Sequence, residues 1–198
     1  MRIVVIRHAE VDFCWSKKCS SDRFDSECSE YDKAPIKKEM YKIPRIKYQR
    51  IYISRLSRSR DTAEKLFPDD KYTESRLISE VPLRSSFDTE KKMPLWFWNA
   101  TGRFQWLINS TRQIEGRRQT KKRARRFVTV ISNENKNCAI VTHGFFMHTL
   151  LQELKKAGFR INNYSFKYKN GEAIIAEKRK TDKITRRIHC EGKKHYIL

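Results

Sequence analysis

Short apolar runs recur along the chain between longer polar stretches. These runs are rich in β-branched residues and only four to six residues long, which is typical of strands that are covered on both faces of a sheet. The pattern predicts strands at residues 2–7, 50–54 and 138–142, and a further short strand with a turn within residues 72–81. The apolar positions of the first run, Ile3 to Ile6, are continuous rather than alternating, so both faces of that strand should be buried.

Other segments place apolar residues at helical spacing. Residues 116–132 form a predicted helix with one apolar stripe, made of Ala124, Phe127, Val128 and Ile131. A second helix is predicted at residues 144–157, where Gly158 supplies a natural C-terminal stop. A shorter helix is expected over residues 61–66.

Three segments are less regular. Residues 9–45 are polar and contain Pro35 and Pro44, so they predict a long irregular connection. Residues 82–114 interrupt the pattern and hold five aromatic residues between positions 96 and 106; these rings form either the small core of an insertion, which we favour, or a lid over a substrate. Asn170-Gly171 predicts a hairpin between residues 164–169 and 172–177.

Strands that alternate with helices indicate an α/β fold with a mainly parallel central sheet and helices on both faces. The length of 198 residues fits a single domain over residues 1–198 with a cap-like insertion at about 82–114. Ligands of such folds bind beyond the carboxyl ends of the strands.

The chain is strongly basic, with 44 Lys and Arg against 23 Asp and Glu and a formal net charge of +21. This charge attracts anions, among which phosphate esters, nucleic acid and anionic membrane surfaces all qualify. Between Arg117 and Arg126 seven of ten residues are basic. This run is either a solvated helix face or a surface that binds polyanions.

Five cysteines, an odd number, argue against a disulfide framework. No N-terminal apolar run is long enough for a signal peptide or a membrane span, so we expect a cytoplasmic protein with reduced thiols. Cys14, Cys19 and Cys28 lie close in sequence, but their spacing is not that of a zinc site. No metal and no cofactor is therefore expected.

Candidate chemistry follows three of the predicted strands, at residues 2–7, 50–54 and 138–142. Arg7 and His8 follow the first strand, residues 54–58 the second, and Thr142-His143-Gly144 the third. Because parallel strands end at one edge of a sheet, these residues should converge. Two arginines, two histidines and a helix N-terminus would supply the donors and the positive charge that a phosphoryl group requires.

These motifs together resemble the histidine phosphatase superfamily, which has the phosphoglycerate mutase-like fold. The family pattern is R-H-G, then S-x-L-x-R-A-x-x-T-A, a carboxylate, and a late strand that ends in H-G. Arg7-His8 matches the first part, with Ala9 in place of Gly, and His143-Gly144 matches the last. The middle motif is matched by Ser54, Leu56, Arg58, Thr62 and Ala63, with Ser59 in place of Ala.

The resemblance implies a role for each matched residue. His8 would accept the phosphoryl group, and Arg7, Arg58 and His143 would hold its oxygens. The family's proton donor is a carboxylate in a segment of the form L-x-E. Glu80 is the best candidate here, although one extra residue separates it from Leu77, and Glu74 is the alternative.

We therefore expect a metal-independent phosphatase that hydrolyses a small phosphate monoester through a phosphohistidine. Two alternatives stay open: a phosphoglycerate mutase-type phosphoryl transferase, and a basic nucleic-acid-binding or regulatory module with a degenerate site. Residues 82–114 lack an extended substrate-binding pattern, which favours hydrolysis over a mutase. Val11 and Cys14 occupy positions where many family members have further phosphate donors.

Overall fold

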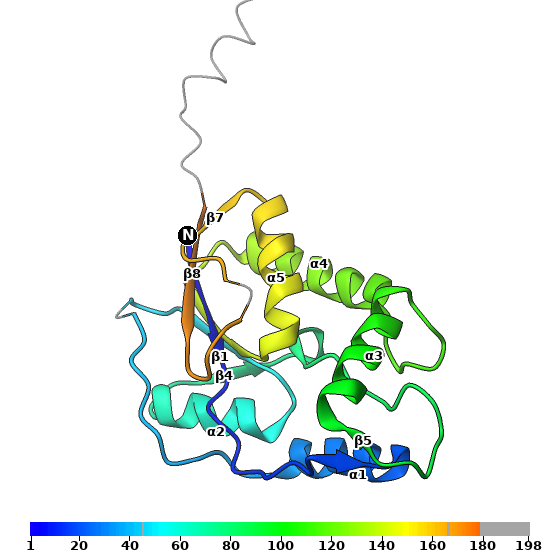
Figure 1. The fold of residues 1–198 in the computed structure, drawn as a ribbon. Helices are drawn as coiled ribbons and strands as arrows, with labels where there is room; N and C mark the ends of the chain where they lie inside the picture. The colour runs from blue at the N-terminus through cyan, green and yellow to red at the C-terminus, as the bar shows by residue number, and fades with distance from the viewer. Residues whose placement is uncertain (45, 166, 179–198) are drawn as a thin grey trace, which may run out of the picture.

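The computed structural model describes residues 1–44, 46–165 and 167–178. A central sheet forms the middle of the molecule (Figure 1). It has six strands, in the order β4-β3-β6-β1-β8-β7. Its strands are β1 (Arg2–Arg7), β3 (Arg50–Ile53), β4 (Tyr72–Glu74), β6 (Cys138–Thr142), β7 (Phe159–Ile161) and β8 (Ala173–Lys178). The first four run parallel, whereas β8 pairs antiparallel with both β1 and β7. The predicted α/β class with a mainly parallel sheet is confirmed.

Helices cover both faces of the sheet. They are α2 (Ser57–Leu66) on one face, and α4 (Arg117–Glu134) and α5 (Gly144–Lys156) on the other. Along β1 the side chains alternate between the two cores: Ile3 and Val5 pack with α4 and α5, while Val4 packs with α2. All three are fully buried, which explains why the sequence shows a continuous apolar run there.

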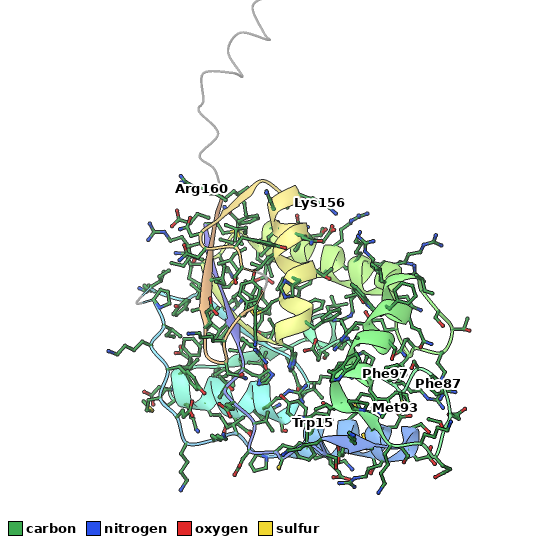
Figure 2. The ribbon with its side chains drawn as sticks, viewed as in Figure 1. Trp15, Phe87, Met93, Phe97, Lys156 and Arg160 are labelled. Carbon is green, nitrogen blue, oxygen red and sulfur yellow. The ribbon has the colours of Figure 1, made fainter. Side chains whose placement is uncertain are left out.

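A third, smaller core joins two segments that are distant in sequence. It contains α1 (Ser21–Lys33), α3 (Leu95–Leu107) and the short paired strands β2 (Lys18–Cys19) and β5 (Met93–Pro94). Phe24 and Trp98 stack at its centre with ring centroids 5.8 Å apart, and Trp15, Met93 and Phe97 surround them (Figure 2). The insertion therefore packs against α1.

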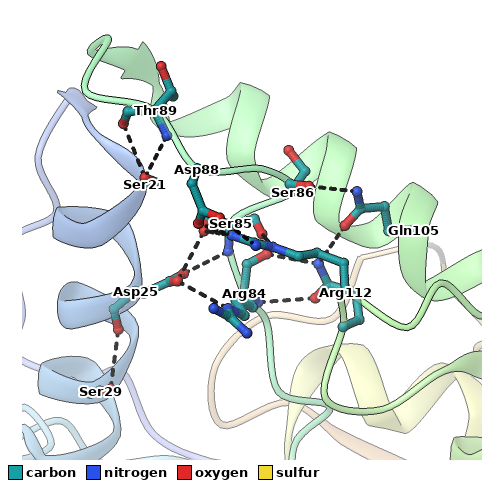
Figure 3. Close-up of polar contacts among 11 residues, drawn as sticks. Ser21, Asp25, Ser29, Arg84, Ser85, Ser86, Asp88, Thr89, Gln105 and Arg112 are labelled. Carbon is teal, nitrogen blue, oxygen red and sulfur yellow. Dashed lines mark hydrogen bonds and ion pairs between the residues drawn. The ribbon is translucent and has the colours of Figure 1, made fainter.

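Polar contacts reinforce this junction (Figure 3). Asp25 of α1 accepts hydrogen bonds from the backbone N–H of Ser85 at 2.6 Å and from its hydroxyl at 3.0 Å, and pairs with Arg84 at 3.6 Å. Arg112 donates to the Ser85 carbonyl at 3.0 Å and pairs with Asp88. These bonds hold the loop before α3 on α1.

The prediction of an irregular connection over residues 9–45 was wrong, because α1 lies within it. The buried positions of α1 are Ser21, Phe24 and Glu27, so only one of them is a large apolar residue. Glu27 is fully buried and accepts hydrogen bonds from Ser16 and Arg23. A helix that buries polar groups in this way has no apolar stripe for sequence analysis to detect.

The predicted hairpin was also wrong in part. The turn at Asn170-Gly171 forms, with Gly171 at φ +71°, but the partners of β8 are β1 and β7 and the described residues of 164–169 form no strand. Tyr168 instead turns into the core, with its ring 5.0 Å from that of His148. The Asn-Gly pair specifies the turn only, since strand pairing depends on which sheet edge is available.

The aromatic residues 96–106 divide between two environments. Trp98 is buried and its indole N–H donates to the Cys19 carbonyl at 3.0 Å. This burial agrees with the interpretation that the aromatic rings form a small core. Trp106 packs against Phe145 at the edge of the main core. Trp96 and Phe104, in contrast, are 69% and 61% exposed.

The cysteines are not cross-linked in the described part of the chain. Cys14, Cys19, Cys28 and Cys138 are free thiols, and Cys190 lies outside that part. The described residues contain no group of three His, Cys, Asp or Glu side chains that could hold a metal ion. None of the helices they form is both long and apolar enough to cross a membrane.

Candidate active site

The ends of β1, β3 and β6 bring the motif residues together at one edge of the sheet. Arg7, His8, Arg58 and Glu80 line a cavity of about 820 Å³. His143 is fully buried next to it, with its ring centroid 5.0 Å from that of His8. The segments that were expected to converge therefore do so.

His8 is held in one tautomer and is neutral. Its Nδ1 lies 2.7 Å from the Ala9 carbonyl oxygen, which can only accept, so Nδ1 carries the proton and Nε2 has a free lone pair. Burial, followed by the positive charges of Arg58 and Arg7, lowers the pKa of His8 to about 3. An imidazole in this state is a nucleophile at neutral pH.

Contacts from three other segments fix the backbone around His8. The His8 N–H donates to the Thr142 carbonyl at 2.8 Å, and the Ala9 N–H donates to the Thr62 hydroxyl at 2.9 Å. Asn170 donates its side-chain amide to the carbonyls of His8 and Ala9, at 3.1 and 3.2 Å. Thr62 belongs to the family pattern, whereas Asn170 was marked in the sequence only as a turn residue.

His143 is anchored through the motif that runs from the end of β3 into α2. Its Nε2 lies 2.6 Å from the Ser54 hydroxyl. Ser59, which replaces the Ala of the family pattern, accepts from the Ser54 N–H at 3.1 Å and donates to the Val141 carbonyl at 2.7 Å. Burial, together with the positive charges of Arg58, Arg123 and Arg7, holds the pKa of His143 well below its usual range. His143 is therefore neutral as well.

The two arginines keep donor capacity after their protein contacts. Arg58 is 1% exposed, lies 5.0 Å from the centroid of the Tyr31 ring and donates to Asp32 at 2.8 Å. Arg7 donates to the Tyr168 carbonyl at 2.5 Å. The Nε atoms of both are buried and have no hydrogen-bond partner among the described residues. Two such guanidinium groups can bind several oxygens of one phosphate.

Gly144 allows the close approach of α5 to Arg7. A Cβ at this position would lie 2.8 Å from Arg7 Nε and 3.0 Å from Arg7 Cζ, which is too close for a normal contact. The H-G pair therefore has a steric reason: the residue after His143 must leave room for the Arg7 guanidinium.

The two candidate carboxylates differ in position. Glu80 lines the cavity, and its oxygens accept hydrogen bonds from the backbone N–H groups of Phe145 and Phe146 at 3.4 and 3.0 Å, at the N-terminus of α5. Glu74 lies in β4, outside the residues that line the cavity, and pairs with Arg60 at 3.2 Å. The extra residue in the L-x-E register thus does not prevent Glu80 from reaching the site.

The wall of the cavity opposite the sheet was not predicted from the sequence. This wall comes from α1 and α3 and includes Tyr31, Asp32, Leu95, Asn99 and Arg103. Arg103 lies with its guanidinium carbon 3.7 Å from the centroid of the Phe145 ring and donates to the Val81 carbonyl at 3.2 Å. No motif marks these residues, because they reach the site only when the insertion packs on α1.

The chain belongs to the histidine phosphatase superfamily (branch 1), whose family model matches residues 3–188. No curated protein sequence matches the chain closely enough to count as a relative.

Solved structures of phosphatases share the fold. An Escherichia coli K-12 protein assigned as an α-ribazole-5′-P phosphatase superposes with a TM-score of 0.57 at 17% identity, over 88% of this chain and 89% of that one. A mycobacterial glucosyl-3-phosphoglycerate phosphatase bound to VO₃ superposes with a TM-score of 0.53 at 16% identity, over 88% of this chain and 91% of that one. A phosphoserine phosphatase from Entamoeba histolytica, in complex with phosphoserine, superposes with a TM-score of 0.51 at 18% identity, over 88% of this chain and 89% of that one.

Proposed function

We propose that this protein hydrolyses a small phosphate monoester through a phosphohistidine on His8. The observation that carries the proposal is the state of His8: neutral, fixed in one tautomer and placed beside two arginines on the cavity wall. Membership of the superfamily and the phosphatases among its structural neighbours support the same reaction class.

Each step follows from the positions of these side chains. The phosphoryl oxygens bind Arg7 and Arg58, and His8 Nε2 attacks phosphorus in line while the bond to the ester oxygen breaks. Glu80 donates a proton to the leaving alcohol. The Glu80 carboxylate then takes a proton from water, the water oxygen attacks phosphorus, and the P–N bond breaks to release phosphate and neutral His8. His143, packed against His8, contributes a further donor to the phosphoryl oxygens.

A panel of phosphorylated metabolites, assayed for phosphate release with and without a strong chelator, tests this function. We expect turnover of at least one monoester, and we expect it to survive the chelator because the arginines supply the charge that a metal would otherwise provide. Loss of turnover that zinc or magnesium restores would contradict a metal-independent mechanism. Transfer of the phosphoryl group to a second hydroxyl instead of water would identify a mutase. Absence of turnover on the whole panel would favour a regulatory module.

We further propose that the protein is cytoplasmic, a compartment in which free thiols such as those of the four described cysteines stay reduced.

The basic run on α4 supports polyanion binding as a second candidate function. Arg117, Arg118, Lys122 and Arg126 are exposed, while the opposite side of the helix packs into the core. Lys122 and Arg126 line a second cavity, of about 470 Å³, whose other lining residues include Arg76. This cavity shares Ser79, Glu80, Pro82 and Ile114 with the first. A polyanion on this face would therefore lie close to the phosphoryl site.

Replacing Arg118, Lys122 and Arg126 together by Gln should weaken nucleic-acid binding and its salt dependence. Each phosphate that the variant no longer neutralises makes the plot of log binding constant against log salt concentration less steep by about 0.7 to 0.9. Titrations at several salt concentrations measure that slope. Arg160→Gln, an exposed substitution on β7, is the matched control and should leave the slope unchanged. A wild-type protein that fails to bind nucleic acid at low salt would remove this second function.

A further inference from the structure

Exposed apolar side chains concentrate in the insertion. Nine large hydrophobic residues are exposed in the described part of the chain, and six of these come from residues 87–114: Phe87, Trp96, Phe104, Leu107, Ile108 and Ile114. Single exposed hydrophobic residues are ordinary, whereas a cluster marks a surface that binds something.

Helix α3 explains the cluster because it presents three different faces. Leu95, Asn99 and Arg103 line the catalytic cavity. Trp98 and Gly102 are buried, Trp98 against Phe24 of α1 and Gly102 against Leu83. The remaining face points to solvent and is apolar along its whole length. We call it the α3 outer face; it consists of Trp96, Ala100, Phe104, Leu107 and Ile108, all exposed and spaced at i, i+4, i+8, i+11 and i+12.

Basic residues flank both ends of this face. Lys91 and Lys92 are exposed and immediately precede β5 and α3. At the other end Arg117 and Arg118 begin α4, and the Arg118 N–H donates to the Asn109 side chain at 2.8 Å, directly after α3. The α3 outer face therefore lies between two pairs of exposed positive charges.

Nearby acidic residues cancel little of this charge. Asp88 is paired with Arg112, and Glu115 is paired with Arg123 at 2.8 Å. Glu90 is exposed, but Lys91 and Lys92 follow it directly in the chain.

We propose that the α3 outer face binds the surface of an anionic lipid membrane. An exposed apolar, aromatic surface with cations at its edges has the side-chain types that bind the membrane interface, where Trp and Phe enter the headgroup layer and Lys and Arg meet anionic lipids. A second copy of the chain is a poor occupant, because each copy carries a net charge of +21 and would present the same basic flanks to the other.

Membrane binding would have a direct consequence for the catalytic cavity. The face of α3 that contains Leu95, Asn99 and Arg103 borders the α3 outer face and lines this cavity. A helix lying flat on the membrane would therefore hold the cavity next to the lipid surface.

Co-sedimentation of the full chain with lipid vesicles tests the proposal. The vesicles contain phosphatidylcholine alone or with about 30% phosphatidylserine. The wild type should bind the anionic vesicles and not the neutral ones. Trp96→Ser with Phe104→Ser should lower the partition coefficient about tenfold or more, because two large side chains no longer leave water. Lys91→Gln with Lys92→Gln should lower it about fivefold for each charge removed.

Val130→Ser, which removes an exposed apolar residue from α4, is the matched control and should bind like the wild type. All variants change exposed residues, so circular dichroism and thermal melting should match the wild type. Failure of the wild type to bind anionic vesicles, or equal binding by the Trp96 and Phe104 variant, would overturn the proposal. If the wild type dimerises and the Trp96 and Phe104 variant does not, the α3 outer face would instead be assigned to a second copy of the chain. If the same face captures an acidic protein, it would be assigned to that partner.

Discussion

His8→Ala should abolish both turnover and the covalent intermediate. The substitution removes Nε2, the atom proposed to attack phosphorus, and leaves the arginines without a nucleophile. The loss in kcat should be about 10⁴-fold or more, as for other enzymes that lose a covalent nucleophile. Brief mixing with a radiolabelled substrate, followed by denaturation in base, should trap an acid-labile phosphoprotein in the wild type and none in the variant.

A second histidine provides the matched control. His148 lies on α5, outside the residues that line the cavity, with its ring against Tyr168. His148→Asn should keep the adduct and the turnover. If the adduct persists in His8→Ala, or depends on His148, then the assignment of the nucleophile is wrong.

The pKa of His8 adds a test that does not require a substitution. Since this pKa is lowered to about 3, the nucleophilic neutral form dominates at every pH above that value. With nitrophenyl phosphate, whose leaving group barely needs a proton from Glu80, the rate of phosphorylation should therefore stay level as the pH falls from 7 to 5, apart from changes in the substrate's own ionisation. An unperturbed histidine, with a pKa of about 6.5, would lose more than nine-tenths of its neutral form over the same range. Pre-steady-state rates measured across this range distinguish the two cases.

Glu80→Gln should slow the hydrolysis of alkyl phosphates far more than that of nitrophenyl phosphate. An alkoxide is a poor leaving group and needs a proton, whereas a nitrophenolate barely does, and removing a general acid costs about 10² to 10⁴ in rate. Gln keeps one side-chain oxygen, which can still accept the shorter of the two bonds, from the Phe146 N–H at 3.0 Å, so the N-terminus of α5 should stay in place. Single-turnover measurements isolate the phosphorylation step from the later attack of water, which uses the same carboxylate.

Glu74→Gln is the control for this prediction, because Glu74 lies in β4, outside the cavity lining. It should leave both substrates unaffected. Equal and small effects of Glu80→Gln on the two substrates would remove Glu80 from the role of proton donor.

The parts of the fold that sequence analysis predicted are those with a strong local pattern. The runs at β1, β3 and β6 are continuous and β-branched because both of their faces are buried, and α4 and α5 show a clear apolar stripe because one side of each packs on the sheet. Helix α1 lacked such a stripe because it buries Glu27, a charged residue that its neighbours satisfy.

By itself, the sequence determined the α/β class and the family, and it placed Arg7, His8, Arg58 and His143 after strands that end at one sheet edge, because these depend on short patterns and on residue identity. Only the tertiary structure decided what surrounds them. The cavity wall from α1 and α3, the ion pair of Asp32 with Arg58, and the lowered pKa of His8 all arise between segments far apart in the chain. Burial and the distance between charges control such properties, and both exist only once the chain has folded.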